Sequence, residues 1–333
     1  MALYLLLLIS EMQEHRQPVT TRGEVISVSV VVATRDRHEL LRRCLHSLRE
    51  SRYPPAEIIV VDSASREPSY TLAVASEFGA SVVLTDIPGA GHARNLGAHV
   101  ASSRVIAFTD DDAWVDPDWV GEIAAGFHDD VVDAVVGPVW VDDANIQKVM
   151  ELPRHCAPGP DREIFSRKYP DWFDRLAFGG IGLGANLAVR RSRFRDRALF
   201  RPCLGAGAPI GGDETYFLFN LVARGGTVVN LPDAKVYHPA QSPARINEIS
   251  RSSLAYLLLL LANNPRLLAK FTRRLLRRRR PIVQARSDDK GAARANRSLN
   301  AFRQFVAVPG LLLAAWRHER LVSQANTSSR AIS

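Results

Sequence analysis

The chain has 333 residues, 46% of them hydrophobic and 23% charged, so it can bury a full core as one large domain or two smaller ones. Three scattered cysteines, Cys44, Cys156 and Cys203, exclude a disulfide-rich scaffold, offer no C-x-x-C pair for structural zinc, and favour a reducing cytosol. The net charge of +8 is uneven, because residues 241–333 carry 18 Lys and Arg against 4 Asp and Glu, whereas residues 1–240 carry 25 against 31.

An apolar stretch, Ala2 to Ile9, lies near the start of the sequence. It has no preceding basic region and no small-residue cleavage pattern after it, so it is a poor signal peptide. A helix needs about 20 residues to span a bilayer, and this stretch is far shorter. We expect residues 1–24 to form a peripheral N-terminal extension.

Residues 25–108 alternate between apolar strand patterns and helical patterns. Val25 to Ala33 is an almost unbroken β-branched run, which is typical of a strand buried on both faces. Leucines at helical spacing between Leu40 and Leu48 predict a helix, which Pro54 and Pro55 end. Further strands are predicted over Ile58–Val61, Ser81–Thr85 and Val105–Phe108, and further helices over Tyr70–Phe78 and His92–Ala101. This alternation indicates an α/β fold with a parallel sheet covered by helices.

Polar side chains follow each predicted strand of this half. Parallel sheets bind ligands beyond the carboxyl ends of their strands, and these ends carry Thr34–Arg37, Asp62, Asp86 and Asp110–Asp112. Three adjacent carboxylates repel one another, and a hard divalent cation such as Mg²⁺ or Mn²⁺ relieves the repulsion. The alternative for the last cluster is a helix cap with two solvated turn residues. The convergence of the strand ends on one edge favours the metal site.

Residues 116–240 show a less regular pattern. Strands are predicted over Asp133–Val141, Gly184–Arg190, Thr227–Asn230 and Lys235–Tyr237, and a loop over Pro153–Pro170. A glycine-rich stretch, Gly205 to Gly212, leads into a predicted helix that runs to about Arg224.

Glycines also precede the helix after the third strand, in Pro88-Gly89-Ala90-Gly91, and Arg94 follows one turn inside that helix. Backbone amides at a helix N-terminus and a fixed cation suit a diphosphate. The loop fails as a dinucleotide fingerprint, because Arg94 occupies the position of the third glycine and the loop follows the third strand. On its own, this loop is weak evidence.

Asp213 and Glu214 are the best candidates for a general base, since a carboxylate beside a bound sugar can deprotonate an incoming hydroxyl. The alternative is a helix start at which acids interact favourably with the helix dipole. His238 either completes the metal site or has a structural role.

Residues 241–333 combine leucines with arginines. Leu254–Leu261 and Val306–Trp316 are apolar but too short to predict transmembrane spans, and Arg277–Arg280 is basic. The apolar segments suit helices that lie on a membrane, or helices that pack on the protein beside a solvated run of charge. The arginine clusters lack interleaved aromatic residues, so no nucleic acid partner is expected.

Five stretches together resemble the family 2 glycosyltransferases with the GT-A fold, and the resemblance covers about Val25 to His238. They are Ser29–Arg37, Ile59–Ser65, Gly91–Gly97, Phe108–Asp112 and Gly212–Glu214. The resemblance implies an α/β GT-A fold with a mostly parallel central sheet flanked by helices, followed by a C-terminal helical basic extension. The expected divisions are a GT-A domain over 25–240, with a nucleotide-binding half over 25–115 and an acceptor-side half over 116–240, and a basic tail over 241–333.

The resemblance also implies roles for individual residues. Those expected to bind the nucleotide sugar are Thr34, Arg35, Asp62, Arg94, Asp110 and Asp111. Those expected to hold the divalent metal are Asp110, Asp112 and His238, while Glu214 is the expected base and Asp213 an acceptor contact. Three departures from the family pattern are Arg35 in place of a frequent aromatic residue, Ser63 in place of a second aspartate, and the order Asp-Glu at 213–214. The last leaves the base open between the two acids.

The implied function is metal-dependent, inverting transfer of a sugar from a nucleotide-diphosphate donor to an acceptor hydroxyl, in envelope glycan, glycolipid or polysaccharide synthesis. The expected partners are the nucleotide sugar and a lipid-linked or glycan acceptor, and the expected location is the cytoplasm, peripheral on the inner face of the cell membrane. Two other functions remain open. A sugar-nucleotide nucleotidyltransferase would need a glycine-rich loop directly after the first strand, whereas Thr34–Arg37 has no glycine. A non-catalytic membrane-associated scaffold has no need of acids that converge on the rim.

Overall fold

A computed structural model of the chain describes residues 25–143, 146–149, 161–170, 172–178, 181–195, 200–239, 255–262 and 307–325. The expectations for residues 1–24, Cys156 and Arg277–Arg280 lie outside the described residues.

The first half of the fold is the predicted alternation of strands and helices. Its elements are β1 (Val28–Thr34), α2 (His38–Arg49), β2 (Glu57–Ser63), α3 (Pro68–Glu77), β3 (Ser81–Thr85), α4 (Ala90–Val100) and β4 (Val105–Asp110). The prediction for this half is confirmed, with boundaries that move by a few residues. β4 runs two residues further than predicted, so Asp110 is the last residue of the strand.

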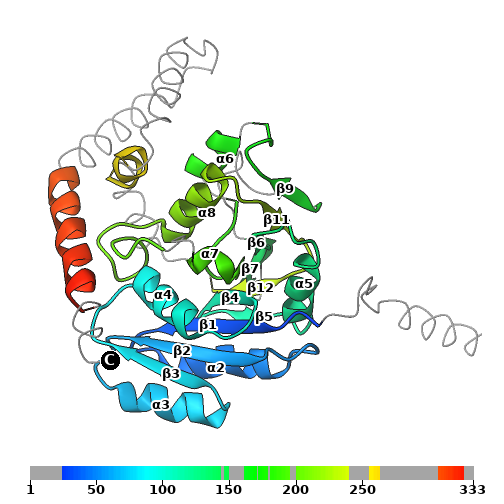
Figure 1. Cartoon of the computed structure of the whole chain (residues 1–333). Helices are drawn as coiled ribbons and strands as arrows, with labels where there is room; N and C mark the ends of the chain where they lie inside the picture. The colour runs from blue at the N-terminus through cyan, green and yellow to red at the C-terminus, as the bar shows by residue number, and fades with distance from the viewer. Residues whose placement is uncertain are drawn as a thin grey trace, which may run out of the picture.

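An eight-stranded sheet forms the centre of the molecule, in the order β3-β2-β1-β4-β10-β6-β11-β9. The pairs among β1 to β4 are parallel, and β10 (Leu187–Arg190) joins β4 as an antiparallel neighbour. In Figure 1 the chain enters β1 from the right, so the parallel strands of this half end at the left of the view. Thr34 pairs with Asp62 and Ala33 with Asp110 in the strand register, which fixes these strand ends side by side.

The second half departs from the sequence prediction at Gly137 and Pro138. The strand predicted over Asp133–Val141 is wrong as one element, because β6 (Ala134–Val136) and β7 (Val139–Asp143) lie in different sheets. A Cβ on Gly137 would lie 2.2 Å from the carbonyl oxygen of Ala234, so only glycine permits the backbone approach at this crossing. Proline has no amide hydrogen to continue the ladder beyond it.

In the described part of this half, the remaining elements are four helices, strands of the second sheet and the two strands at the far edge of the first sheet. They are β5 (Trp114–Val115), α5 (Trp119–Gly126), β8 (Ile146–Val149), β9 (Glu163–Phe165), α6 (Trp172–Phe178), α7 (Ser192–Arg195), α8 (Asp213–Ala223), β11 (Val228–Asn230) and β12 (Val236–His238). The second sheet has the order β5-β12-β7-β8. The loop prediction over Pro153–Pro170 is corrected in part by β9, which pairs with β11, while residues 151–160 lie outside the described part.

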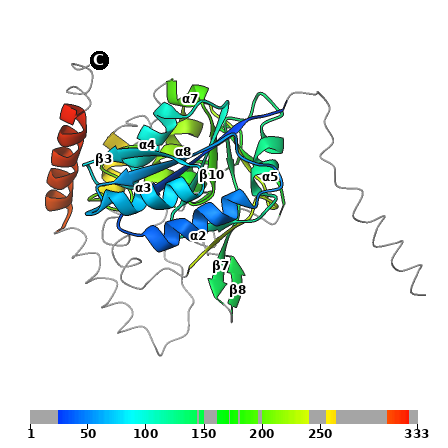
Figure 2. The same cartoon turned by 90° about the horizontal axis from the view of Figure 1, so that it is seen from below.

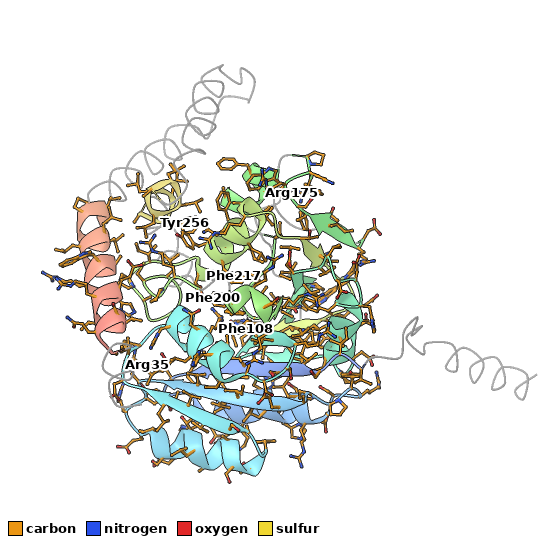
Figure 3. The ribbon with its side chains drawn as sticks, viewed as in Figure 1. Arg35, Phe108, Arg175, Phe200, Phe217 and Tyr256 are labelled. Carbon is orange, nitrogen blue, oxygen red and sulfur yellow. The ribbon has the colours of Figure 1, made fainter. Side chains whose placement is uncertain are left out.

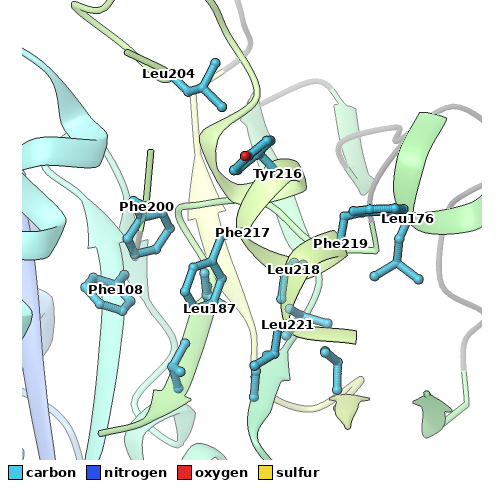
Figure 4. Close-up of a cluster of buried hydrophobic side chains, with 14 of the residues drawn as sticks. Phe108, Leu176, Leu187, Phe200, Leu204, Tyr216, Phe217, Leu218, Phe219 and Leu221 are labelled. Atoms are coloured by element: carbon cyan, nitrogen blue, oxygen red, sulfur yellow. The ribbon is translucent and has the colours of Figure 1, made fainter. Parts of the chain in front are cut away.

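Alternate residues of the central strands enter two different cores. Val31 and Phe108 belong to the core on the side of α4 and α8, whereas Val30 and Ala107 belong to the core on the side of α2 and α5. Both faces of the sheet are therefore buried, which explains the unbroken apolar runs in the sequence. In the first core, the rings of Phe108, Phe200 and Phe217 pack together (Figure 4), with 4.6 Å between the centroids of the last two.

Two helices after residue 240 pack against this core. Ala255 and Leu260 of the helix over 255–262, and Val308 and Ala315 of the helix over 307–325, are buried in it. The second helix stands at the edge of the molecule at which the parallel strands end, as Figures 1 and 2 both show. Among the described residues, no helix has the length and apolar character needed to cross a membrane.

Candidate active site

The end of β4 delivers three aspartates into three different surroundings. Asp111 points inward and is fully buried, whereas Asp110 and Asp112 remain partly exposed. The buried carboxylate accepts a hydrogen bond from Thr34 Oγ1 at 2.7 Å and contacts Arg37 Nη2 at 2.8 Å. Burial raises the pKa of Asp111 to about 7, although Arg37 and Thr34 act in the opposite direction. Asp111 therefore links the end of β4 to Thr34 and Arg37 at the end of β1, while Asp110 and Asp112 remain accessible at the carboxyl edge of the sheet.

Asp110, Asp112 and His238 form a possible metal site. Each offers one ligand atom, and these atoms lie within 4.8 Å of one another. His238 Nε2 lies 3.0 Å from Asp112 Oδ1, and Arg37 Nη1 donates to the other oxygen at 2.6 Å. Burial alone would lower the pKa of His238, but the Asp112 carboxylate raises it to about 9, which favours the charged imidazolium near neutral pH.

The donor set fits a divalent ion such as Mn²⁺ or Mg²⁺. Carboxylate oxygens suit both ions, and a neutral imidazole is an acceptable ligand for the softer Mn²⁺. Arg37 donates to Asp112, and a charged His238 is a further cation beside the acids. His238 would have to lose its proton at Nε2 to act as a metal ligand.

Arg94 connects the end of β4 to the start of α8. Its Nη2 donates to Asp110 Oδ1 at 2.7 Å, and its Nη1 forms a short ion pair with Asp213. The guanidinium is buried, and the two carboxylates raise its pKa despite the cost of burial, so it stays charged. A Cβ on Gly184 would lie 2.6 Å from Nη2, so the absence of a side chain at Gly184 makes room for this bridge.

The acidic pair at the start of α8 occupies two environments. Asp213 is buried against Arg94, and Gly205, at φ 105°, passes so close that a Cβ there would lie 2.8 Å from Asp213 Cγ. Glu214 is half-buried. Burial and the neighbouring charge of Asp213 raise the pKa of Glu214 well above its ordinary value. A carboxyl with a raised pKa is a stronger proton acceptor when ionised, as a general base requires.

Asp62 and Arg35 stand at the same edge but outside this network. Asp62 accepts hydrogen bonds from the Ser65 amide and the Thr71 hydroxyl, so its carboxylate fixes the turn after β2. Arg35 is exposed at the carboxyl edge of the sheet (Figure 3). Within the described residues, the Arg35 side chain forms no hydrogen bond or ion pair.

The glycine loop before α4 is more closed than the sequence suggested. Ser63 Oγ accepts from the Gly89 amide at 3.0 Å, and the carbonyl oxygen of Ala206 accepts from the Ala90 amide at 2.8 Å. Two of the amides expected to meet a diphosphate are thus already bonded to the protein. Arg94, one turn inside α4, points into the network through its contacts with Asp110 and Asp213.

The structure gives positions in the site to two residues to which the sequence assigned no role of their own. Arg37 contacts both Asp111 and Asp112, and its place in the polar cluster after β1 was the signal for it. Tyr256, from the helix over 255–262, packs its ring 3.3 Å from where a Cβ on Gly212 would lie. Nothing local in the sequence marked Tyr256, because its contact depends on how a distant segment folds back.

Comparison with known proteins identifies a family for the part of the chain that carries the three aspartates. The family model of glycosyl transferase family 2 matches residues 29–191, which include β1 to β4 and the aspartates. Residues 29–191 belong to glycosyl transferase family 2. The match ends before α8, so Asp213 and Glu214 lie beyond the matched residues of the family 2 domain.

Two curated proteins share part of this family 2 domain. One is EpsH of Bacillus subtilis (strain 168), which carries the name of a glycosyltransferase and is 33% identical over 116 residues. The other is the glucosyl-dolichyl phosphate glucuronosyltransferase of Haloferax volcanii, 30% identical over 127 residues. These matches cover 33% and 35% of this chain, and the chain spans 33% and 40% of the length of the two relatives.

Solved structures share the fold. The mannosyltransferase PcManGT from Pyrobaculum calidifontis, in complex with GDP-Man and Mn²⁺, is 19% identical with a TM-score of 0.51, covering 95% of this chain and 94% of its own. TarS 1-349 of S. aureus in complex with UDP-GlcNAc is 17% identical with a TM-score of 0.51, covering 70% and 67%. The prediction of an α/β GT-A fold, with a mostly parallel sheet flanked by helices, is confirmed.

Proposed function

We propose that this chain is a glycosyltransferase that moves a sugar from a nucleotide-diphosphate donor to an acceptor hydroxyl with inversion at the anomeric carbon. The observation that carries the proposal is the Arg94 bridge, because one buried guanidinium contacts both Asp110 and Asp213. The first acid belongs to the possible metal site, and the second adjoins the candidate base. A transferase that joins two substrates needs both kinds of acid in one place.

On the donor side, Asp110, Asp112 and His238 would hold a divalent ion, which supplies neutralisation of the departing diphosphate. Thr34 and Asp111 keep the end of β4 in place for this purpose. Arg37 contacts Asp112 and lies at the rim as a second cation for the phosphates. Nucleotide sugars are bound in the similar PcManGT and TarS structures, which supports this class of donor.

On the acceptor side, Glu214 is the proposed base. Asp213 is held by Arg94 and is therefore committed to an ion pair, whereas Glu214 has a raised pKa and is half-buried at the start of α8. Glu214 takes the proton of the acceptor hydroxyl as that oxygen attacks the anomeric carbon, and the nucleoside diphosphate leaves from the opposite face. No covalent intermediate with the protein is required.

The acceptor is proposed to be a lipid-linked or envelope glycan, and the protein to work in the cytoplasm on the inner face of the cell membrane. The charge asymmetry of the sequence supports this location, since residues 241–333 have a net charge of +14 whereas residues 1–240 have a net charge of −6.

The test is nucleoside diphosphate release from a panel of UDP- and GDP-sugars, with Mn²⁺, Mg²⁺ or EDTA and a mixture of lipid-linked acceptors. Asp112→Asn should lower turnover by about 10²-fold or more, because it removes a charged ligand of the ion. Asp130→Asn, at a side chain that is 89% exposed, is the matched control and should leave turnover unchanged. Normal turnover of Asp112→Asn, or full activity in EDTA, would contradict the metal role. Failure of every donor would contradict the transferase itself.

A further inference from the structure

The helix over 307–325 has two chemically distinct faces. Its inner face carries Val308, Ala315 and Val322, which are buried against the domain, together with His318 and Glu319. Glu319 accepts a hydrogen bond from Arg201 Nε at 2.6 Å, so the acid of this helix is turned toward the protein. The helix is thus fixed to the domain by burial and by an ion pair.

The outer face carries large apolar side chains. Leu313, Trp316 and Leu321 are 48%, 53% and 57% exposed, so three large apolar side chains reach solvent from one helix. Arg317 and Arg320 are exposed between them. Their spacing of three, four, seven and eight residues from the first leucine places all five on one side of the helix. We call these five residues the outer face.

The charge on the outer face has a single sign. The helix has two arginines and one glutamate, and the glutamate is the one turned inward. Arg320 lies 4.8 Å from the centre of the Trp316 ring, so a cation and an aromatic ring are held together at the surface. Apolar side chains flanked by arginines are suited to an anionic surface that is apolar underneath.

We propose that the outer face of the helix over 307–325 docks on an anionic lipid bilayer. Trp316 and the two leucines enter the boundary between head groups and acyl chains, and Arg317 and Arg320 bind lipid phosphates. A bilayer fits better than a second copy of the chain, because two such faces would bring four arginines together without an acid. The helix lies at the periphery of the molecule (Figures 1 and 2), and the five side chains of the outer face are exposed.

The docking also has a consequence for the site. His318, on the inner face, has Nε2 buried without a hydrogen-bond partner among the described residues, and a Cβ on Gly89 would lie 3.3 Å from that nitrogen. Arg201, which binds Glu319, lies in the loop that leads to α8. The docked helix therefore holds the donor edge of the domain close to the membrane, where a lipid-linked acceptor would be present.

The experiment is sedimentation of the full chain with vesicles of phosphatidylcholine alone and of phosphatidylcholine mixed with phosphatidylglycerol. Two double variants address the face: Leu313→Asn with Trp316→Ala, and Arg317→Gln with Arg320→Gln. The control is Tyr70→Ala with Leu72→Asn on α3, where the side chains are 57% and 45% exposed. Circular dichroism verifies folding of each variant, and the arginine variant touches no buried group.

The wild type and the control should bind the anionic vesicles, and both face variants should bind about ten-fold more weakly, equivalent to about 1.4 kcal/mol. Quenching by brominated lipid should fall in Trp316→Phe. Absence of wild-type binding to anionic vesicles would overturn the proposal. If the face variants bound the vesicles as tightly as the wild type, the lipid contact would lie elsewhere in the chain and the proposal would be wrong. A dimer that Trp316→Ala dissociates would show instead that a second copy covers the outer face. No nucleotide sugar is present, so the result is independent of glycosyl transfer.

Discussion

Replacing Gly184 with alanine should break the Arg94 bridge without changing the identity of any charged residue. The added Cβ would lie 2.6 Å from Nη2, 3.0 Å from Cζ and 3.2 Å from Nη1 of Arg94. Ordinary contact begins at 3.4 Å, so the guanidinium must withdraw by about 0.8 Å. It is the free end of a long side chain, but Asp110 and Asp213 hold it on two sides.

The cost follows from these contacts. Overpacking of a buried site costs about 1–3 kcal/mol, and weakening a charge-assisted hydrogen bond costs about 1.5–3 kcal/mol. The two costs are not additive, because one movement of the Arg94 side chain relieves the steric overlap and weakens the hydrogen bond together. We therefore expect Gly184→Ala to lower the free energy of unfolding by about 2–3 kcal/mol. A displacement of that size in the site should also lower turnover by about 10²-fold.

Urea unfolding followed by circular dichroism measures the stability, and nucleoside diphosphate release measures the turnover. Gly121→Ala is the matched control. The added Cβ would lie 3.4 Å from Tyr53 Cβ, which is ordinary contact, and Gly121 is inside α5, where alanine is a better helix former than glycine. Gly121→Ala should be as stable as the wild type or more so. Unchanged stability and turnover in Gly184→Ala would refute the position of Arg94 on which the bridge depends.

Three further changes test other parts of the network. Glu214→Gln should lower kcat by about 10²–10⁴-fold with little change in KM, because it removes the proton acceptor; steady-state kinetics measure both. Thr34→Val removes a donor to the buried carboxylate of Asp111 and should lower the free energy of unfolding by about 1–3 kcal/mol at alkaline pH. Since the folded pKa of Asp111 is raised to about 7, the loss should grow as pH rises through that value and be smaller at pH 5 in urea titrations. Burial would raise the pKa of Glu319, but Arg201 lowers it, so the pair stabilises the fold above the ordinary glutamate pKa. Glu319→Gln should therefore cost about 1 kcal/mol at pH 7, and the difference should vanish as pH falls through the lowered pKa.

Matched variants decide each of these outcomes. A larger loss in Asp213→Asn than in Glu214→Gln would move the base to the first acid of the pair. Thr34→Ser keeps the hydroxyl and should recover most of the stability, so an equal loss would show that packing, and not the hydrogen bond, is responsible. Glu77→Gln breaks an exposed pair with Arg42 and should cost less than Glu319→Gln. A pH-independent loss in Glu319→Gln would contradict the ion pair.

Strand positions in the first half could be predicted because the signal is local. The strands over Val28–Thr34 and Val105–Thr109 are covered on both faces, so their residues are apolar or small until the chain reaches the edge of the sheet at Asp110. The polar residues that follow mark the edge, and parallel register brings the edges together. The strand predicted across Gly137 and Pro138 failed, because the apolar pattern does not reveal that the chain passes from one sheet to another there.

The sequence alone determined the α/β alternation, the acidic edge of the sheet, the family resemblance and the two acids at the start of α8. These depend on residue type and spacing within short windows, where burial and helical period leave a direct trace. Tertiary structure decided which acid forms an ion pair with which arginine. Arg94 and Asp213 are 119 residues apart, and Arg201 and Glu319 are 118 apart. Only the folded chain brings such pairs together, because contact across that separation depends on the packing of every intervening element. The same packing turned Asp111 inward and Trp316 outward, a difference in surroundings that residue type does not encode.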